Sequence, residues 1–186
     1  LKNFLNKYNG INIILISRSS SLDNNSYSYD DFYAGNIDEK IDIFIHLASP
    51  NYDYCKDDSL RNGIVVLTEN ILRNLESYEC KKFIYFSSCK VYGESSMDNV
   101  IFNETSKLNP ISDYAKAKAD AESMVSDISL KNNISFLIYR LPFVYGSGMK
   151  SNLKTLLNII NQSIPFILIK SQSSLKKSFV CIDNIN

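Results

Sequence analysis

Short apolar runs that alternate with longer amphipathic stretches are the feature that most limits how this chain can fold. The runs are rich in β-branched and aromatic residues, which is typical of strands that are buried on both faces of a sheet. The expected strands are Ile11–Ile16, Ile41–Leu47, Phe83–Phe86 and Ile134–Leu141. Because helical stretches separate them, the sequence predicts an α/β fold, a doubly wound parallel sheet with helices on both faces.

Two of the intervening stretches carry an apolar stripe at helical spacing. The stripe of the first, near Ser59–Tyr78, consists of Leu60, Ile64, Leu67, Ile71 and Leu75. The second runs from Tyr114 to Ile128, and its stripe consists of Ala117, Ala121, Met124, Val125 and Ile128. Ser112 or Asp113 can cap this second helix. The polar segment Ser19–Asp31 is expected to be an exposed loop, with a short strand near Phe32.

A serine, a tyrosine and a lysine stand where one reaction can use all three. Ser88 follows the strand Phe83–Phe86, at the carboxyl end where open α/β sheets bind ligands. Tyr114 and Lys118 are four positions apart, so they share one face of the second helix. The Tyr-x-x-x-Lys pattern occurs twice more, at Tyr52 and Tyr78, but only Tyr114 follows a strand that ends in Ser-Ser.

These residue types suit the interconversion of an alcohol and a ketone. A free tyrosine has a pKa of about 10, and lowering it to about 7 requires about 4 kcal/mol. One nearby ammonium supplies about that much at an effective dielectric constant of about 20. We therefore expect Lys118 to lower the pKa of Tyr114, while Ser88 binds the same substrate oxygen. The hydride needs an acceptor that no side chain provides, which implies a nicotinamide.

The order of its motifs makes the chain resemble the extended short-chain dehydrogenase/reductases, in particular the nucleotide-sugar 4-epimerase and 4-keto-reductase branch. The resemblance covers nearly the whole chain and includes Ser-Ser-x-x-Val-Tyr-Gly and the Tyr-x-x-x-Lys helix. Three further segments match in the family's order: Asp42–Ser49, Arg140–Leu153 and Lys177–Asn184. The resemblance implies a Rossmann-like fold and a redox reaction at C4 of a nucleotide-linked hexose, in which UDP is the expected nucleotide.

The resemblance also implies a role for particular residues. Ser88, Tyr114 and Lys118 would be catalytic, and Tyr114 and Lys118 would also contact the cofactor. The other expected cofactor contacts are Asn36 and Ile37 beside adenine, Leu47, Ala48 and Ser49 along the cofactor, and Pro142 near the nicotinamide.

Three departures from the family's pattern narrow the function. Cys89 and Lys90 stand where nucleotide-sugar 4,6-dehydratases carry an acid pair, so dehydration is not expected. Phe143 replaces an asparagine of the galactose epimerases, which leaves a 4-keto-sugar reductase open beside an epimerase. Ile64 and Leu67 replace the Asn and Gly of an expected Asn-x-x-Gly-Thr signature.

A non-catalytic sensor that binds NADP(H) or a nucleotide sugar is the alternative function from another class of protein.

The cofactor type depends on Arg18, which follows the expected strand Ile11–Ile16. A carboxylate at this place favours NAD, whereas an arginine suits the 2′-phosphate of NADP. An exposed arginine without a ligand is an equally good interpretation. The sequence therefore predicts NAD or NADP as the cofactor.

The ends of the chain indicate a fragment of a longer protein. The first residues have helical spacing as far as Gly10, and no glycine-rich phosphate loop precedes them. We expect residues 1–148 to be a dinucleotide-binding domain without its first strand. Residues 149–186 would begin a substrate-binding part, with a helix at Leu153–Ile160 and an apolar run at Phe166–Ile169.

The composition limits the kinds of partner that this chain is expected to bind. Lys plus Arg and Asp plus Glu number 20 each, so no overall field favours nucleic acid or an anionic membrane. No apolar run approaches the length of a membrane span, and we expect a cytoplasmic enzyme whose full-length form can pair as a homodimer. The four cysteines lack metal-ligand spacing, and the single histidine, His46, is expected to be a satisfied core residue.

Overall fold

A three-stranded parallel sheet forms the centre of the molecule. The computed structural model describes residues 10–18, 25–50, 58–93, 101–147, 158, 161–162 and 178–185. The central sheet has the order β3 (Ile43–His46), β4 (Lys82–Ser88) and β5 (Ser135–Leu141), all parallel. The four strands expected from the sequence are therefore present in the described chain, with β1 (Leu15–Ser17) as the first of them.

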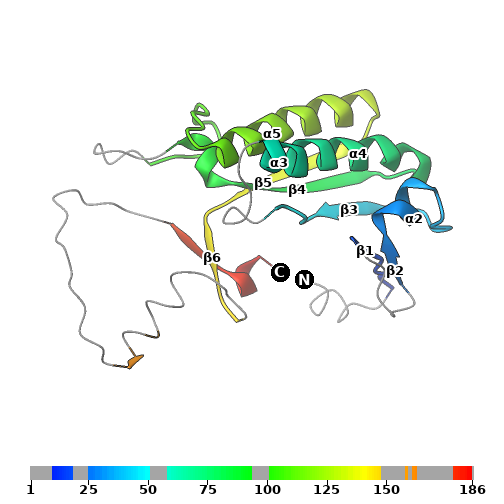
Figure 1. Ribbon diagram of the computed structural model, residues 1–186, viewed down its shortest axis with the longest axis horizontal. Coiled ribbons are helices and arrows are strands. Elements are labelled where there is room, and N and C mark those ends of the chain that lie inside the picture. Colours follow the sequence, from blue (N-terminus) through cyan, green and yellow to red (C-terminus); the bar gives the residue numbers. More distant parts are fainter. Residues whose placement is uncertain are drawn as a thin grey trace.

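Two further pairs of parallel strands flank this sheet (Figure 1). β1 pairs with β2 (Ser26–Ser28), and β6 (Phe143–Tyr145) pairs with β7 (Phe179–Cys181). The sequence predicted one continuous sheet, whereas the described strands hydrogen-bond in three separate sets. The parallel Rossmann-like character is confirmed, because every described strand pair is parallel.

A composite helix connects β3 to β4. It consists of α3 (Asp58–Arg61), a π-helical turn η2 (Asn62–Val66), α4 (Leu67–Asn74) and a closing 3₁₀ turn η3 (Leu75–Tyr78). The predicted stripe is confirmed, since Leu60, Ile64, Ile71 and Leu75 are buried and Leu67 packs against them. Pro50 lies so close to Gly63 that a Cβ there would be 2.6 Å from the proline ring.

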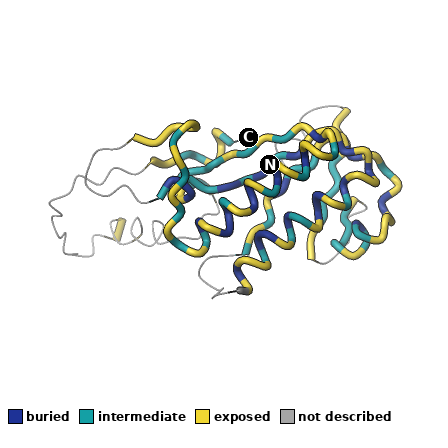
Figure 2. Tube along the Cα trace, turned by 90° about the horizontal axis from the view of Figure 1, so that it is seen from above, coloured by how far each residue is buried: buried dark blue, intermediate teal, exposed yellow. Residues whose placement is uncertain are grey.

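The second long helix, α5 (Asp113–Lys131), connects the loop after β4 to β5. Ser112 is its N-cap and accepts a hydrogen bond from the Ala115 N–H, as predicted. Ala117, Ala121 and Val125 are buried against the sheet. In Figure 1 the helices α3, α4 and α5 lie together on one face of β3, β4 and β5, and Figure 2 shows buried and exposed positions alternating along them.

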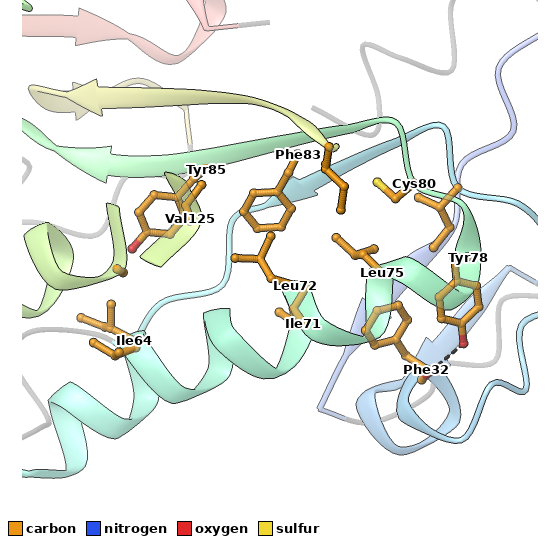
Figure 3. Packing of buried hydrophobic residues seen from close by; sticks show 14 of the residues in the cluster. Phe32, Ile64, Ile71, Leu72, Leu75, Tyr78, Cys80, Phe83, Tyr85 and Val125 are labelled. Atoms are coloured by element: carbon orange, nitrogen blue, oxygen red, sulfur yellow. Dashed lines mark hydrogen bonds between the residues drawn. The ribbon is translucent and has the colours of Figure 1, made fainter. Parts of the chain in front are cut away.

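Aromatic packing joins this sheet to the β1–β2 region. Phe32 belongs to a short helix, α2 (Tyr29–Tyr33), and not to the strand expected near it. Ser28 and Asp31 form a capping box, which favours a helix at this place. The Phe32 ring stacks on Tyr78 at 5.0 Å, and the Tyr78 hydroxyl donates to the Phe32 carbonyl oxygen at 2.6 Å (Figure 3).

Several expectations fall outside the described residues. These are the helix before Gly10 and nearly all of the segments Leu153–Ile160 and Phe166–Ile169. The division of the chain at residue 148 stays a prediction. Within the described chain, no helix has both the length and the apolar character that crossing a bilayer requires.

Candidate active site

The carboxyl ends of β3, β4 and β5 bring most of the predicted site residues to one edge of the sheet. Leu47, Ala48 and Ser49 directly follow β3, and Ser88 is the last residue of β4. Pro142 directly follows Leu141, which is the register partner of Ser88. Leu47 is 55% exposed, so an apolar side chain faces solvent beside the hydroxyls of this edge.

Tyr114 lies in the first turn of α5, above this edge. Hydrogen bonding with the Ser49 and Ser88 hydroxyls lowers its pKa, but burial is the larger effect and raises the pKa above the ordinary value. The expected net fall in the pKa of Tyr114 is therefore wrong for this structure, in which burial outweighs every stabilising contact of the phenolate. The physical reason is that the phenol is desolvated while the Lys118 Nζ atom lies 6.0 Å from the centre of its ring.

Lys118 lies one turn later on the same face of α5. Its side chain is almost fully buried, and its Nζ atom donates to the Phe86 carbonyl oxygen at 2.9 Å. The same atom lies 4.8 Å from the centre of the Tyr85 ring, where a cation is attracted to the aromatic face. Burial lowers the pKa of Lys118 to about 8, against the opposing effect of the Glu122 carboxylate. The amine therefore titrates close to neutral pH.

His46 and Thr68 lie beneath the site and are satisfied core residues, as predicted for His46. Thr68 donates its hydroxyl proton to the Ile64 carbonyl oxygen at 2.6 Å. Its oxygen must then accept from His46 Nε2, which lies 3.0 Å away, so the Nε2-protonated tautomer is present. Burial, with a smaller contribution from the Lys118 charge, lowers the pKa of His46 to about 3, so the ring is neutral.

The two residues that directly follow Ser88, Cys89 and Lys90, carry no carboxylate. Cys89 and Lys90 begin the 3₁₀ turn η4 (Cys89–Tyr92), and the Lys90 Nζ atom lies 5.8 Å from the centre of the Tyr114 ring. Burial raises the pKa of the Cys89 thiol, which disfavours the thiolate that a nucleophile needs. Two lysine ammonium groups therefore lie near the Tyr114 ring.

The residues expected at the adenosine end lie apart from this edge. Asn36 and Ile37 come after α2 and before β3, near the amino end of that strand. The Ile37 side chain is 3% exposed and packs in the core, so a contact with adenine would have to come from its backbone. Arg18 directly follows β1, and its charge acts on Tyr29, which directly follows β2. Tyr29 is thus a candidate that the sequence reasoning missed.

The sequence reasoning also missed a buried acid. Glu122 lies four residues after Lys118 and is 4% exposed. It accepts hydrogen bonds from Ser87 Oγ at 2.5 Å and from Arg140 Nη2 at 2.8 Å. The signal was present, because Tyr114, Lys118 and Glu122 repeat at a spacing of four and therefore share a helix face.

The donors at this edge fit a nicotinamide nucleoside. An ammonium has three N–H donors, and the described contacts of Lys118 use one of them on Phe86. The exposed Leu47 offers an apolar surface to an aromatic ring, and the Ser49 hydroxyl lies beside it. Across the described ranges, the His, Cys, Asp and Glu side chains form no group of three that could hold a metal ion.

The chain is similar to a family model and to several known proteins. Residues 6–175 match the family described as NAD dependent epimerase/dehydratase. The UDP-glucose 4-epimerase of Vibrio cholerae is 30% identical over 118 residues, which are 63% of this chain and 36% of that protein. The dTDP-D-glucose 4,6-dehydratase of Dictyostelium discoideum is 33% identical over 141 residues, with 62% of this chain and 32% of that protein covered.

The fold is similar to that of a solved enzyme. The crystal structure of UDP-glucuronic acid 4-epimerase from Bacillus cereus, in complex with UDP-glucuronic acid and NAD, matches with a TM-score of 0.70 at 23% identity. The match covers 88% of this chain and 54% of that one. The chain therefore spans about a third of the length of the two relatives and about half of the solved structure.

Proposed function

Because this chain belongs to the NAD dependent epimerase/dehydratase family, we propose that its protein is an NAD(P)-dependent redox enzyme. The substrate is a nucleotide-linked hexose, with UDP as the nucleotide, and the reaction takes place at C4. The observation that carries the proposal is the meeting of three groups. The Tyr114 phenol hydrogen-bonds with Ser49 and Ser88, and Lys118 lies one turn away on the same helix.

The three side chains have separate tasks in this proposal. Tyr114 takes the proton of the C4 hydroxyl through its Oη atom, and Ser88 donates a hydrogen bond to the same substrate oxygen. The Lys118 charge stabilises the phenolate that forms at Tyr114. In the return direction Tyr114 donates the proton to the C4 oxygen.

The dinucleotide would rest on the edge that these residues share. Lys118 has donors for a ribose hydroxyl, while Leu47, Ala48 and Pro142 line the nicotinamide side. When bound, the nicotinamide accepts a hydride from C4 and returns it. Arg18 and Tyr29 are the better candidates for the adenosine end than Asn36 and Ile37. Arg18 would contact a 2′-phosphate, so NADP is as compatible with this end as NAD.

An epimerase and a reductase share these steps, but they begin with Tyr114 in opposite protonation states. Burial raises the pKa of Tyr114, so the tyrosine holds its proton at neutral pH. A reductase needs Tyr114 as an acid that protonates the C4 oxygen of a 4-keto sugar. An epimerase needs it first as a base, which requires a lower pKa once the ligands are in place.

Dehydration fits the site less well, although the family includes dehydratases and the Dictyostelium discoideum relative is one. Expelling water from a sugar needs an acid and a base beside the reacting carbons. Cys89 and Lys90 follow Ser88 instead of carboxyl groups, and the buried Glu122 is already paired with Arg140. We therefore assign the chain to the epimerases and reductases of the family.

Turnover by the complete protein tests the proposal. The purified protein is mixed with UDP-hexoses or their 4-keto forms, and nicotinamide absorbance and sugar stereochemistry are followed together. Inversion at C4 without net cofactor consumption identifies an epimerase, and net consumption identifies a reductase. Nucleotide binding without any turnover would reject the enzymatic function in favour of a sensor.

A further inference from the structure

A cluster of four buried or half-buried polar side chains lies directly behind the candidate active site. We call it the Glu122 cluster, and it consists of Ser87, Tyr92, Glu122 and Arg140. Arg140 Nε lies 3.0 Å from Glu122 Oε2 and 3.1 Å from Oε1, and Nη2 lies 2.8 Å from Oε2. Arg140 Nη1 donates to the Tyr92 hydroxyl at 2.8 Å, so the guanidinium joins the acid to η4.

Each member of the cluster comes from a different element that borders the site. Ser87 belongs to β4 and directly precedes Ser88. Arg140 belongs to β5 and is the register partner of Ser87. Glu122 belongs to α5 and follows Lys118 by one turn. The cluster therefore connects the strand end that carries Ser88 with the helix that carries Tyr114 and Lys118.

Stability alone does not explain why an ion pair lies here. Glu122 is 4% exposed and Arg140 is 23% exposed in this pair. Desolvating two charges costs free energy that their attraction offsets only in part, and apolar residues of similar size are often as stabilising. Glu122 instead contacts Ser87, which is next to Ser88, and lies one turn after Lys118 on α5. This placement indicates a role in the active site.

We propose that Glu122 is a positioning residue for Ser88, Tyr114 and Lys118, an inference that rests on the function proposed above. Its carboxylate ties the carboxyl end of β4 to α5 through Ser87. Its negative charge also keeps the buried Lys118 amine protonated. The first task fixes the distance between Ser88 and Tyr114, and the second preserves the cation that stabilises the phenolate.

The electrostatic part of this role follows from what surrounds Lys118. Tyr114 and Glu122 face it from α5, the Tyr85 ring faces it from β4, and the neutral His46 lies on β3. Glu122 is the carboxylate that raises the pKa of Lys118 against burial. With a pKa of about 8, about nine tenths of Lys118 is charged at pH 7. A fall of about one unit would leave only about half of it charged.

A titration of Lys118 tests the electrostatic role of Glu122, and it needs neither substrate nor dinucleotide. The complete protein is labelled with [¹³C]lysine, and the Cε shift of Lys118, assigned with Lys118→Met, is followed against pH. Glu122→Gln keeps the shape of the side chain and removes its charge. We expect the midpoint to fall by at least about one pH unit. Glu69→Gln is the matched control, because it breaks an ion pair with Arg73 on the exposed side of α4 and leaves the midpoint unchanged.

Ser87→Ala tests the positioning part by removing the link to β4 and leaving the charge in place. We expect kcat to fall about tenfold, because small displacements at a reacting centre are costly. KM should change less than about twofold, and the Lys118 midpoint should stay in place. Should Glu122→Gln fail to fold, Glu122→Asp replaces it, since it keeps the charge but shortens the reach to Ser87. That variant should keep the midpoint and lose kcat as Ser87→Ala does.

The two readouts separate this proposal from the function on which it rests. A parent protein with no turnover rejects the enzymatic function, while the titration still decides the role of Glu122. An unchanged Lys118 midpoint in Glu122→Gln overturns the electrostatic role. Parental kcat in Ser87→Ala overturns the positioning role. A lower midpoint together with a lower kcat supports both.

Discussion

Replacing Lys118 by methionine should stabilise the protein at neutral pH while abolishing its activity. Burial lowers the pKa of Lys118 from 10.5 to about 8. At about 1.4 kcal/mol for each pKa unit, keeping this amine charged in the folded state costs about 3 kcal/mol. The variant avoids this cost but loses the hydrogen bond to Phe86, which contributes about 1 kcal/mol. We expect a net gain of about 2 kcal/mol at pH 7.

The pH dependence of this gain has a definite sign. The unfolded chain binds the Lys118 proton up to pH 10.5, whereas the folded protein releases it from about pH 8. Between these values the parent gains stability as the pH rises, because its unfolded state holds more protons. The advantage of Lys118→Met should therefore shrink by about 3 kcal/mol across this window and be fully present below it.

Urea unfolding of parent and variant at several pH values measures this difference, because the other titrating groups cancel. Lys116→Met is the matched control on the same helix, since the Lys116 side chain is 58% exposed and pairs with Asp113 at 3.4 Å. The difference in the free energy of unfolding between Lys116→Met and the parent should stay nearly constant with pH. A stability difference for Lys118→Met that does not change between pH 7 and 10.5 would refute the reasoning.

Three further changes test other parts of the account. Tyr85→Phe removes a buried hydroxyl that has no hydrogen-bond partner among the described residues. The free energy of unfolding should therefore rise by about 1 kcal/mol. A lower free energy of unfolding, measured with urea, would contradict this. Arg18→Ala should weaken NADPH binding at least about tenfold and leave NADH unaffected if Arg18 holds a 2′-phosphate; calorimetry that shows no change in either affinity excludes that contact. Gly93→Ala should lower the free energy of unfolding by about 2 kcal/mol or more, since φ is 97° and a Cβ would lie 2.7 Å from the Asn109 carbonyl oxygen; Gly35→Ala, with φ of 75° and open space, should cost less.

The sequence predicts the elements that depend on local pattern. The strand around Phe83 and the helix from Asp113 are present because an apolar run and a capped apolar stripe are signals contained within each segment. Ser88, Tyr114 and Lys118 meet because parallel strands end at one edge and residues four apart share a helix face.

The missed features depend on contacts between distant segments or on an overlooked local signal. The π turn at Asn62–Val66 lies where Pro50 packs on Gly63, and a helical pattern contains no sign of that contact. The short helix at Phe32 did have a local signal, the Ser28–Asp31 capping box. The direction of the Tyr114 pKa depends on how far the fold buries the phenol, which spacing alone does not predict.

The rate of Tyr114→Phe in the complete protein tests the central proposal most directly. The substrate is a UDP-hexose carrying deuterium at C4, and transfer of deuterium between sugar and nicotinamide is followed in parent and variant. The phenylalanine keeps the ring near the two lysines and removes only the hydroxyl that would carry the proton. We expect the transfer to slow at least about a hundredfold, with dinucleotide affinity little changed. Near-parental transfer in Tyr114→Phe would show that another group moves the proton.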